Sequence, residues 1–276
     1  MVVFSSVIGY LLAPKVVRYD WGMIAVLFVA GMMVTGSANA INQVTEKDTD
    51  ALMKRTAGRP VAAGRMSSAE GWAFAIIIGA LGVGLLWYFF NGLSAGLALF
   101  SLFLYAFVYT PLKKVAAIAV LVGAFPGALP CLIGWAAGND AVMPTVHGSK
   151  DWGGWVLFAL QFLWQFPHFW AIAWLAHGDY SKAGFKLLPD QGGPTRYTAL
   201  QTVIYALLLL PVGVLFYAIG LCGITSLVIV TLANLALLWQ CIQLYRQGTA
   251  KEARRVMFGS YIYLPVVMLA LVADKL

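Results

Sequence analysis

Charged side chains are scarce in this chain. Only 11% of its 276 residues are Asp, Glu, Lys or Arg, whereas a soluble globular domain usually carries about 25%. Hydrophobic residues make up 61% of the sequence. This composition excludes an ordinary soluble globular protein and indicates an integral membrane protein of the all-α class.

Cysteines and long polar segments are also few. Cys131, Cys222 and Cys241 lack the spacing of a metal site, and each lies within or beside an apolar run, so we expect them to act as small packing residues. No polar stretch is long enough to form a soluble domain, and residues 1–276 are therefore treated as a single domain. The net charge of +7 favours contacts with anionic lipid or an anionic substrate, and nothing indicates nucleic-acid binding.

Apolar runs follow one another from end to end, most of them near the roughly 20 residues that cross a bilayer as a helix. We predict about nine spans, at residues 3–13, 21–41, 71–90, 93–110, 116–137, 153–176, 198–220, 222–244 and 256–273. The first span is too short to cross unaided. Either the natural chain begins earlier and this helix is truncated, or the helix enters only part of the membrane.

Basic residues fall in alternate connections between these spans. Connections 42–70, 111–115, 177–197 and 245–255 contain 14 of the 18 Lys and Arg residues. The positive-inside rule then places these loops and the N-terminus in the cytoplasm, although Lys15 and Arg18 lie on the opposite side. No transit segment or low-complexity tail is visible, which favours the inner membrane of a bacterial cell over an organelle.

An array of oxygen-bearing side chains marks the first basic connection. Asn42, Glu46 and Asp50 are four residues apart, and four residues make about 400° of helix. If the helix that begins near Trp21 continues, all three project within an arc of roughly 80°, with Asp48 turned away. Such ligands suit a hard divalent cation such as Mg²⁺. The alternative is that these are solvated charges where a helix leaves the bilayer.

Cations that suit phosphate oxygens accompany this array. Lys54, Arg55 and Arg59 follow it directly. In the connection 177–197, Asp179 and Lys182 could form the opposite wall of a diphosphate site, although this loop alone has the composition of a solvated turn. A third loop contributes Tyr109 and Lys113, the latter from a lysine pair that could instead anchor to lipid headgroups.

Two segments inside the spans are irregular. Trp164-Gln165-Phe166-Pro167-His168 places a histidine beside a helix-interior proline. His168 either faces a cavity, as a proton carrier or a ligand to a metalloporphyrin, or is buried and hydrogen-bonded to a neighbouring helix. The segment 123–130, rich in Gly and Pro, indicates close helix packing or room for a bulky flat substrate.

Taken together, these motifs resemble the protoheme IX farnesyltransferases, the haem O synthase family of the UbiA-type intramembrane prenyltransferases. The resemblance covers about residues 5–274. Trp164-Gln165-x-Pro167-His168 followed by Asp179-Tyr180-x-x-Ala183-Gly184 narrows it to the haem enzymes. It departs from the family at Glu46, where the first acid is usually Asp, and at His177 and Gly178, and the family's stretch before the first helix has no counterpart.

The resemblance implies a bundle of about nine transmembrane helices that transfers the farnesyl group of farnesyl diphosphate to a vinyl group of haem b. It implies Mg²⁺ held by Glu46, Asp50 and Asp179, with Asn42 in support and haem b as a substrate rather than a permanent cofactor. The residues expected to bind substrate are Lys54, Arg55, Arg59, Tyr109, Lys113, Trp164, His168 and Lys182. Haem A synthase or a terminal oxidase is the expected partner, besides membrane lipid.

Two other functions remain open from sequence alone. The first is prenyl transfer to a quinone precursor or a chlorophyll-type acceptor. The second, of a different class, is a multi-pass transporter, which would show an internal repeat and polar groups near the bilayer centre. No such repeat is evident, and the acids lie at the rim of a span.

Overall fold

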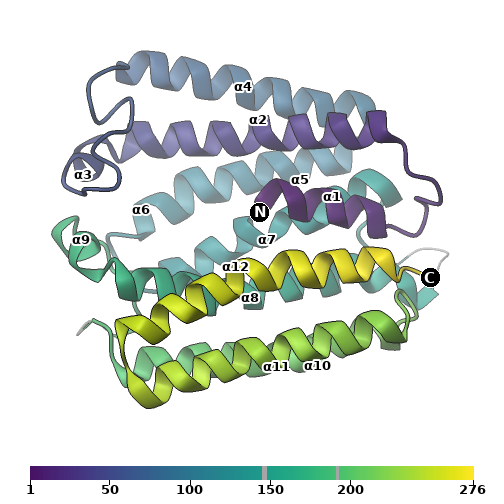
Figure 1. The fold of residues 1–276 in the computed structure, drawn as a ribbon. Helices are drawn as coiled ribbons and strands as arrows, with labels where there is room; N and C mark the ends of the chain where they lie inside the picture. Colours follow the sequence, from purple (N-terminus) through teal and green to yellow (C-terminus); the bar gives the residue numbers. More distant parts are fainter. Residues whose placement is uncertain (145–147, 191–192) are drawn as a thin grey trace.

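The protein is an all-helical bundle whose long helices run side by side in alternating directions (Figure 1). The structure, a computed structural model, describes residues 1–144, 148–190 and 193–276. The long helices are α2 (Trp21–Thr45), α4 (Ser68–Phe89), α5 (Gly92–Phe103), α7 (Ala119–Asn139), α8 (Gly153–Leu175), α10 (Arg196–Ala218), α11 (Ile224–Gln247) and α12 (Ala250–Ala273). The shorter elements are α1 (Val2–Leu12), α3 (Lys47–Ala51), η1 (Leu104–Tyr109), α6 (Thr110–Leu112), η2 (Gly148–Trp152) and α9 (His177–Lys182).

The predicted spans coincide with these helices. Within the described part of the chain, eight helices are long and apolar enough to cross a membrane, with α5, η1 and α6 together forming one of them. The ninth, α1, is the short one, at 11 residues. This arrangement is that of a multi-pass membrane protein, and it confirms the fold class predicted from the sequence.

All four basic connections lie at one end of the bundle. In Figure 1 the loops that join α2 to α4, α6 to α7, α8 to α10 and α11 to α12 meet at the left, and the C-terminus lies at the right. We call the end with these four loops the basic end. The alternation expected from the charge distribution is therefore present in the fold.

Helices α7 and α8 form the interior of the bundle. In its most apolar stretch α7 is 72% buried and α8 is 67% buried, whereas α2, α4 and α5 are each 22% buried. The remaining helices surround this pair and expose apolar residues such as Trp87, Phe107 and Ile262 outward. Most side chains of α7 and α8 therefore contact protein, whereas many side chains of the outer helices are exposed on the outside of the bundle, where lipid would lie.

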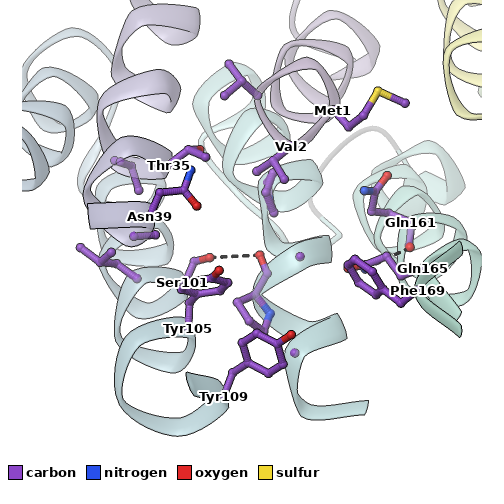
Figure 2. Close-up of a pocket in the computed structure, with 18 of the residues that line it drawn as sticks. Met1, Val2, Thr35, Asn39, Ser101, Tyr105, Tyr109, Gln161, Gln165 and Phe169 are labelled. Atoms are coloured by element: carbon purple, nitrogen blue, oxygen red, sulfur yellow. Dashed lines mark hydrogen bonds between the residues drawn. The ribbon is translucent and has the colours of Figure 1, made fainter. Parts of the chain in front are cut away.

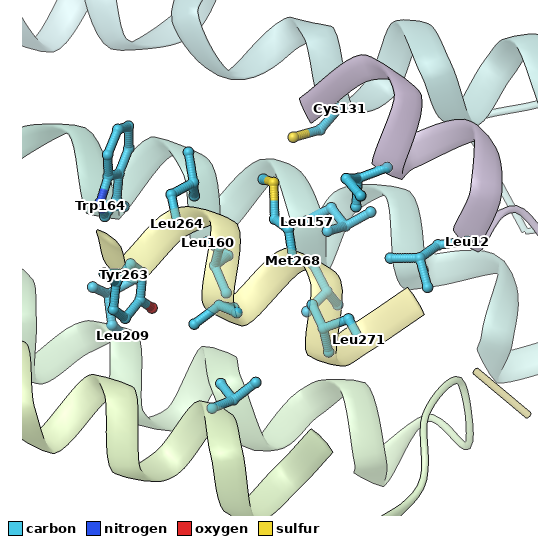
Figure 3. Close-up of a cluster of buried hydrophobic side chains, with 14 of the residues drawn as sticks. Leu12, Cys131, Leu157, Leu160, Trp164, Leu209, Tyr263, Leu264, Met268 and Leu271 are labelled. Carbon is cyan, nitrogen blue, oxygen red and sulfur yellow. The ribbon is translucent and has the colours of Figure 1, made fainter. Parts of the chain in front are cut away.

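The main core lies where α12 packs between α8 and the pair α10 and α11 (Figure 3). Leu157 and Leu160 on α8 belong to this core together with Leu264 and Met268 on α12, and all four side chains are fully buried. Cys131, Cys222 and Cys241 are buried and unpaired with one another, as their packing role predicts. This cluster fixes α12 against the helix that carries His168.

Helix α1 approaches α7 closely because glycines remove side chains from the contact. A Cβ atom on Gly134 would collide with the carbonyl oxygen of Ser6, and one on Gly9 would collide with that of Cys131. The α1–α7 pair thus depends on backbone-to-backbone packing of the small-residue type common between membrane helices. Consequently Met1, Val2 and Val3 reach the interior cavity described below.

We predict that Gly134→Ala lowers the stability of the bundle. Because the added methyl meets backbone rather than a movable side chain, the expected loss is about 1–3 kcal/mol. Thermal unfolding of the detergent-solubilised protein measures it. The matched control is Gly84→Ala on α4, where nothing lies within 4 Å of the added Cβ and alanine should be neutral or stabilising. Equal melting of the two variants would contradict the close contact.

Candidate active site

The acidic array is buried at the basic end. Asn42, Glu46 and Asp50 are 6%, 4% and 0% exposed, whereas Asp48 is exposed. Helix α2 does not continue through all of them, because Glu46 leaves helical geometry (φ −106°, ψ 15°) and α3 begins at Lys47. The condition of one continuous helix is therefore not met at this residue. Backbone bonds from Glu46 N to Asn42 O (2.9 Å) and from Asp50 N to Glu46 O (2.7 Å) nevertheless preserve the four-residue spacing.

Lys113 is buried against this array. Its ammonium lies 2.7 Å from Glu46 Oε1 and donates a hydrogen bond to Asn42 Oδ1 at 3.1 Å. The Thr110 hydroxyl donates to the same amide oxygen at 3.3 Å. Burial lowers the pKa of Lys113, and the Glu46 carboxylate acts in the opposite direction. Lys113 therefore balances a buried carboxylate, and only its neighbour Lys114 is exposed as a headgroup anchor would be.

Asp50 has its own counter-ion. Arg59 Nη1 lies 3.0 and 2.8 Å from the two carboxylate oxygens of Asp50, whose side chain is fully buried while Arg59 is 36% exposed. The Thr56 hydroxyl holds the backbone of the same residue by donating to Asp50 O at 2.9 Å. Each of the two acids thus pairs with one cation of the basic end.

The three loops of the site are joined to one another. Arg55 Nη2 donates to the Tyr180 hydroxyl at 2.6 Å, and its guanidinium lies 4.7 Å from the centre of that ring. Lys186 N donates to the carbonyl of Lys113 at 2.9 Å. Burial raises the pKa of Tyr180, against the effect of Arg55, so the phenol stays neutral. These contacts bring α9 and the connections 46–67 and 113–118 together.

Asp179 lies next to Tyr180 on α9 and is partly buried. Its side chain has no hydrogen bond or ion pair in the parts of the chain that the structure describes. Lys54 and Lys182 are exposed. Asp179 and these two lysines therefore lie on the loops that meet at the site, but they are not bonded to Glu46 or Asp50.

A cavity of about 500 Å³ leads from these loops into the bundle. Arg55 and Tyr180 line it at the basic end, and Trp164 and His168 line it between the helices. Figure 2 shows Ser101, Tyr105 and Tyr109 on one side of it and Gln161, Gln165 and Phe169 of α8 on the other. Most of the remaining lining is aliphatic. The cavity thus offers one charged end and a largely apolar interior.

The segment 123–130 supplies both packing and room. Gly123, Pro126, Gly127 and Pro130 all line the cavity. A Cβ on Gly123 would lie 2.6 Å from Tyr109 Cδ2, so the absence of a side chain lets that ring pack against α7. The same glycines and prolines thus allow close packing and line the space that a bulky substrate would need.

His168 has a defined hydrogen-bond partner. Its Nδ1 lies 2.8 Å from Ser260 Oγ on α12, and the Ser260 hydroxyl donates to Met257 O at 2.7 Å. Because a serine has one hydroxyl proton, Ser260 Oγ must accept from His168 Nδ1–H. The Nε2 atom then keeps its lone pair. His168 is thus both bonded to a neighbouring helix and part of the cavity wall. Its ring stacks on that of Trp164, with the two ring centroids 4.8 Å apart.

The donor set at the basic end suits a hard cation, because Asn42, Glu46 and Asp50 all present oxygen atoms. Within the described residues, however, no group of three or more His, Cys, Asp or Glu side chains is arranged to hold a metal ion. Arg59 and Lys113 balance the two acids instead. Ligation by Glu46, Asp50 and Asp179 therefore remains a prediction.

Comparison with known protein families gives a match over most of the chain. The profile of the UbiA prenyltransferase family matches residues 2–263. The chain belongs to this family. A transporter, the alternative from another class, therefore has no support.

Relatives of the family share close to the whole length of the chain. A protoheme IX farnesyltransferase of Cytophaga hutchinsonii is 44% identical over 279 residues, covering 100% of this chain and 93% of the relative. A Flavobacterium johnsoniae protein of the same name is 40% identical, covering 99% and 90%. Among solved structures, a UbiA homologue from Archaeoglobus fulgidus bound to GPP and Mg²⁺ has a TM-score of 0.67 at 16% identity, covering 99% of this chain and 95% of that one.

The structure adds lining residues that the sequence interpretation missed. Asn39, Tyr105 and Gln161 line the cavity of this UbiA member. Asn39 and Gln161 are amides inside apolar spans, and polar groups there are costly enough to indicate function, so the signal existed in the sequence. Tyr105 carries no such signal, because tyrosine is common in membrane helices.

We predict that Lys113→Met destabilises the protein. The substitution leaves the Glu46 carboxylate buried without a cation, and breaking a buried pair in this way costs roughly 3–5 kcal/mol. Thermal unfolding in detergent is the measurement. Lys114→Met, one residue away and exposed, is the control and should lie within about 0.5 kcal/mol of the parent. Equal stability of both variants would show that Glu46 does not need its partner.

Proposed function

We propose that this UbiA-family chain transfers the farnesyl group of farnesyl diphosphate to a vinyl group of haem b, producing haem O. The observation that carries the proposal is that one cavity contains both a cationic end, at Arg55, and a histidine further in, His168, whose Nε2 lone pair is not used in a hydrogen bond within the described residues. The relatives called protoheme IX farnesyltransferase support the same reaction. We propose further that residues 1–276 act as one transmembrane prenyltransferase domain.

The basic end suits a diphosphate. Arg55, Arg59 and Lys113 already lie within bonding distance of polar groups at the site, and Lys54 and Lys182 are exposed on the same loops. We propose that these side chains bind the phosphate oxygens. Arg59 and Lys113 would turn from the carboxylates of Asp50 and Glu46 to phosphate when the substrate enters, and a divalent cation bound with the substrate would then compensate the two acids.

Glu46, Asp50 and Asp179 would hold Mg²⁺, with Asn42 in support. When bound, the ion draws negative charge from the leaving diphosphate. The fit rests on the oxygen chemistry of these side chains, and the UbiA homologue solved with GPP and Mg²⁺ supports a divalent cation. Asp179, which has no partner within the described residues, would become bonded only in the loaded site.

The apolar interior suits the hydrocarbon chain and the porphyrin. The allylic carbon–oxygen bond breaks, and diphosphate leaves with the electron pair, where Arg55 and its neighbours stabilise the charge. The haem vinyl group supplies its π electrons to the allylic carbon. Water then adds to the resulting cation and releases a proton. The largely apolar lining protects the allylic cation from early hydrolysis.

We assign His168 and Trp164 to the haem. The Nε2 lone pair of His168 lies on a residue that lines the cavity, and neutral imidazole is a common iron ligand. Trp164 donates from Nε1 to Ser260 O at 3.0 Å and stacks on His168, offering a flat surface to a porphyrin. Tyr109 lines the cavity closer to the basic end.

We propose a location in the bacterial inner membrane, which the multi-pass fold and the bacterial relatives support. By the positive-inside rule the basic end, and the site with it, faces the cytoplasm, and the N-terminal end of α1 points toward the same side from within the bundle (Figure 1). The product would pass to haem A synthase or to assembly of a terminal oxidase. A diphosphate that arrives from the cytoplasm would first contact the cationic side chains at the basic end.

The experiment that tests the proposal supplies the purified protein with farnesyl diphosphate, Mg²⁺ and one acceptor at a time. We expect a haem of increased mass with haem b, and no prenylated product with a quinone precursor or a chlorophyll-type alcohol. Mass spectrometry of the extracted products distinguishes these outcomes. Prenylation of a quinone precursor in place of haem would overturn the choice of acceptor and leave the family assignment intact.

The same assay tests the acidic array. Asp50→Asn should lower the rate of transfer by at least about 100-fold, because a buried carboxylate at the diphosphate end is lost. Asp48→Asn is the matched control, since Asp48 is exposed two residues away and should keep the parent rate. Wild-type turnover by Asp50→Asn would remove the cation-binding role of this array.

A further prediction concerns how His168 is oriented. Ser260→Ala removes the acceptor of His168 Nδ1–H, and losing such a partner of a metal-binding histidine typically weakens metal binding by roughly 10–100-fold. We expect the absorption spectrum of added ferric haem to shift toward that of His168→Ala, with weaker binding. Ser260→Thr, which keeps the hydroxyl, should restore both. A parent-like spectrum for Ser260→Ala would exclude an orienting role for Ser260.

A further inference from the structure

A second hollow lies on the outside of the bundle, between α11 and α12 at the basic end. It has a volume of about 490 Å³ and is open on its outer side. Lys251, Arg254 and Arg255 line one part, and Phe258 and Ile262 line the other. Gln240 of α11 completes it. The groove shares no lining residue with the large cavity, so it is separate from the proposed active site.

The cationic part of the groove has an excess of positive charge. Glu252, the one acid in the segment 245–255, is 2% exposed and pairs with Arg255 at 2.8 Å. Lys251 and Arg254 have no side-chain partner in the described parts of the chain. Both lie near the N-terminal end of α12, which itself carries partial positive charge. Two uncompensated cations at this end attract an anion.

The groove changes from charged to apolar along one helix. Lys251 and Ile262 are eleven residues apart, which is about 16 Å of α-helix and close to half the roughly 30 Å of a bilayer's hydrocarbon core. Phe258 and Ile262 are 56% and 67% exposed. A soluble anion would leave these side chains uncovered. The ligand that matches the whole groove has an anionic head and a hydrocarbon chain.

The floor of the groove has an unsatisfied polar atom. Gln240 Oε1 is buried without a hydrogen-bond partner among the described residues. The amide lies against Gly259, where an added Cβ would collide with it, so the glycine makes space for Gln240 beside α12. The Gln240 side chain is thus held against α12 and closes the inner side of the groove.

We propose that this groove binds one anionic phospholipid of the membrane leaflet at the basic end. Its phosphate pairs with Lys251 and Arg254, and one acyl chain lies along Phe258 and Ile262. Basic pockets between membrane helices bind anionic headgroups in this way. The site is independent of the reaction proposed above, because it lies outside the cavity and uses other residues.

Native mass spectrometry of the detergent-purified chain tests the proposal. Phosphatidylglycerol and phosphatidylcholine with identical acyl chains are titrated separately. We expect one phosphatidylglycerol to bind at least about tenfold more tightly than phosphatidylcholine, and Lys251→Gln/Arg254→Gln to lose roughly 10–30-fold of that affinity, since each basic residue near the surface contributes to anionic-lipid binding. Lys251→Arg/Arg254→Lys, which keeps the charge, should bind as the parent does.

The matched control is Lys15→Gln/Arg18→Gln, which removes the same charge from exposed residues outside the groove and should retain the bound lipid. Parent-like binding of phosphatidylglycerol by Lys251→Gln/Arg254→Gln would overturn the proposal. So would equal affinity for the two lipids. Displacement of the lipid by an equal concentration of glycerol phosphate would show a site for a soluble anion instead, and would also overturn it.

Discussion

The polar end of this protein depends on one buried ammonium group. Lys113 Nζ neutralises Glu46 and bonds Asn42 at the end of α2, while the carbonyl of the same residue accepts from Lys186 beyond α9. A carboxylate in such surroundings is tolerated only when a cation and hydrogen bonds compensate it. A requirement of charge therefore joins two segments that are remote in the sequence, and a backbone hydrogen bond adds the third. The proposed diphosphate site depends on this pairing, because Lys113 compensates Glu46 within the site itself.

The rest of the bundle places an apolar space behind that polar end. The most buried helices, α7 and α8, contain the glycines and prolines that line the cavity. Interior helices with small residues leave room that bulky residues would fill. A charged leaving group and two hydrophobic substrates can thus meet at the boundary between the loops and the bundle.

Much of this organisation could be predicted from the sequence. Hydrophobic run lengths located every span, and the four-residue spacing placed Asn42, Glu46 and Asp50 on one face, because both signals are local. The end of α2 at Glu46 and the choice of Lys113 over Lys114 as its partner were not predictable. The Lys113–Asn42 and Arg55–Tyr180 bonds join residues 71 and 125 positions apart, and such pairs depend on how the helices pack.

The bond between His168 and Ser260 has a consequence for how the protein is made. Helix α8 is the least apolar of the eight long spans, and its polar side chains are costly in lipid until they find acceptors. Gln165 bonds the carbonyl of Ala124 on α7, which is synthesised earlier, but Trp164 and His168 bond α12, which is synthesised later than α8. One wall of the cavity is thus completed only when α12 leaves the ribosome and joins the bundle.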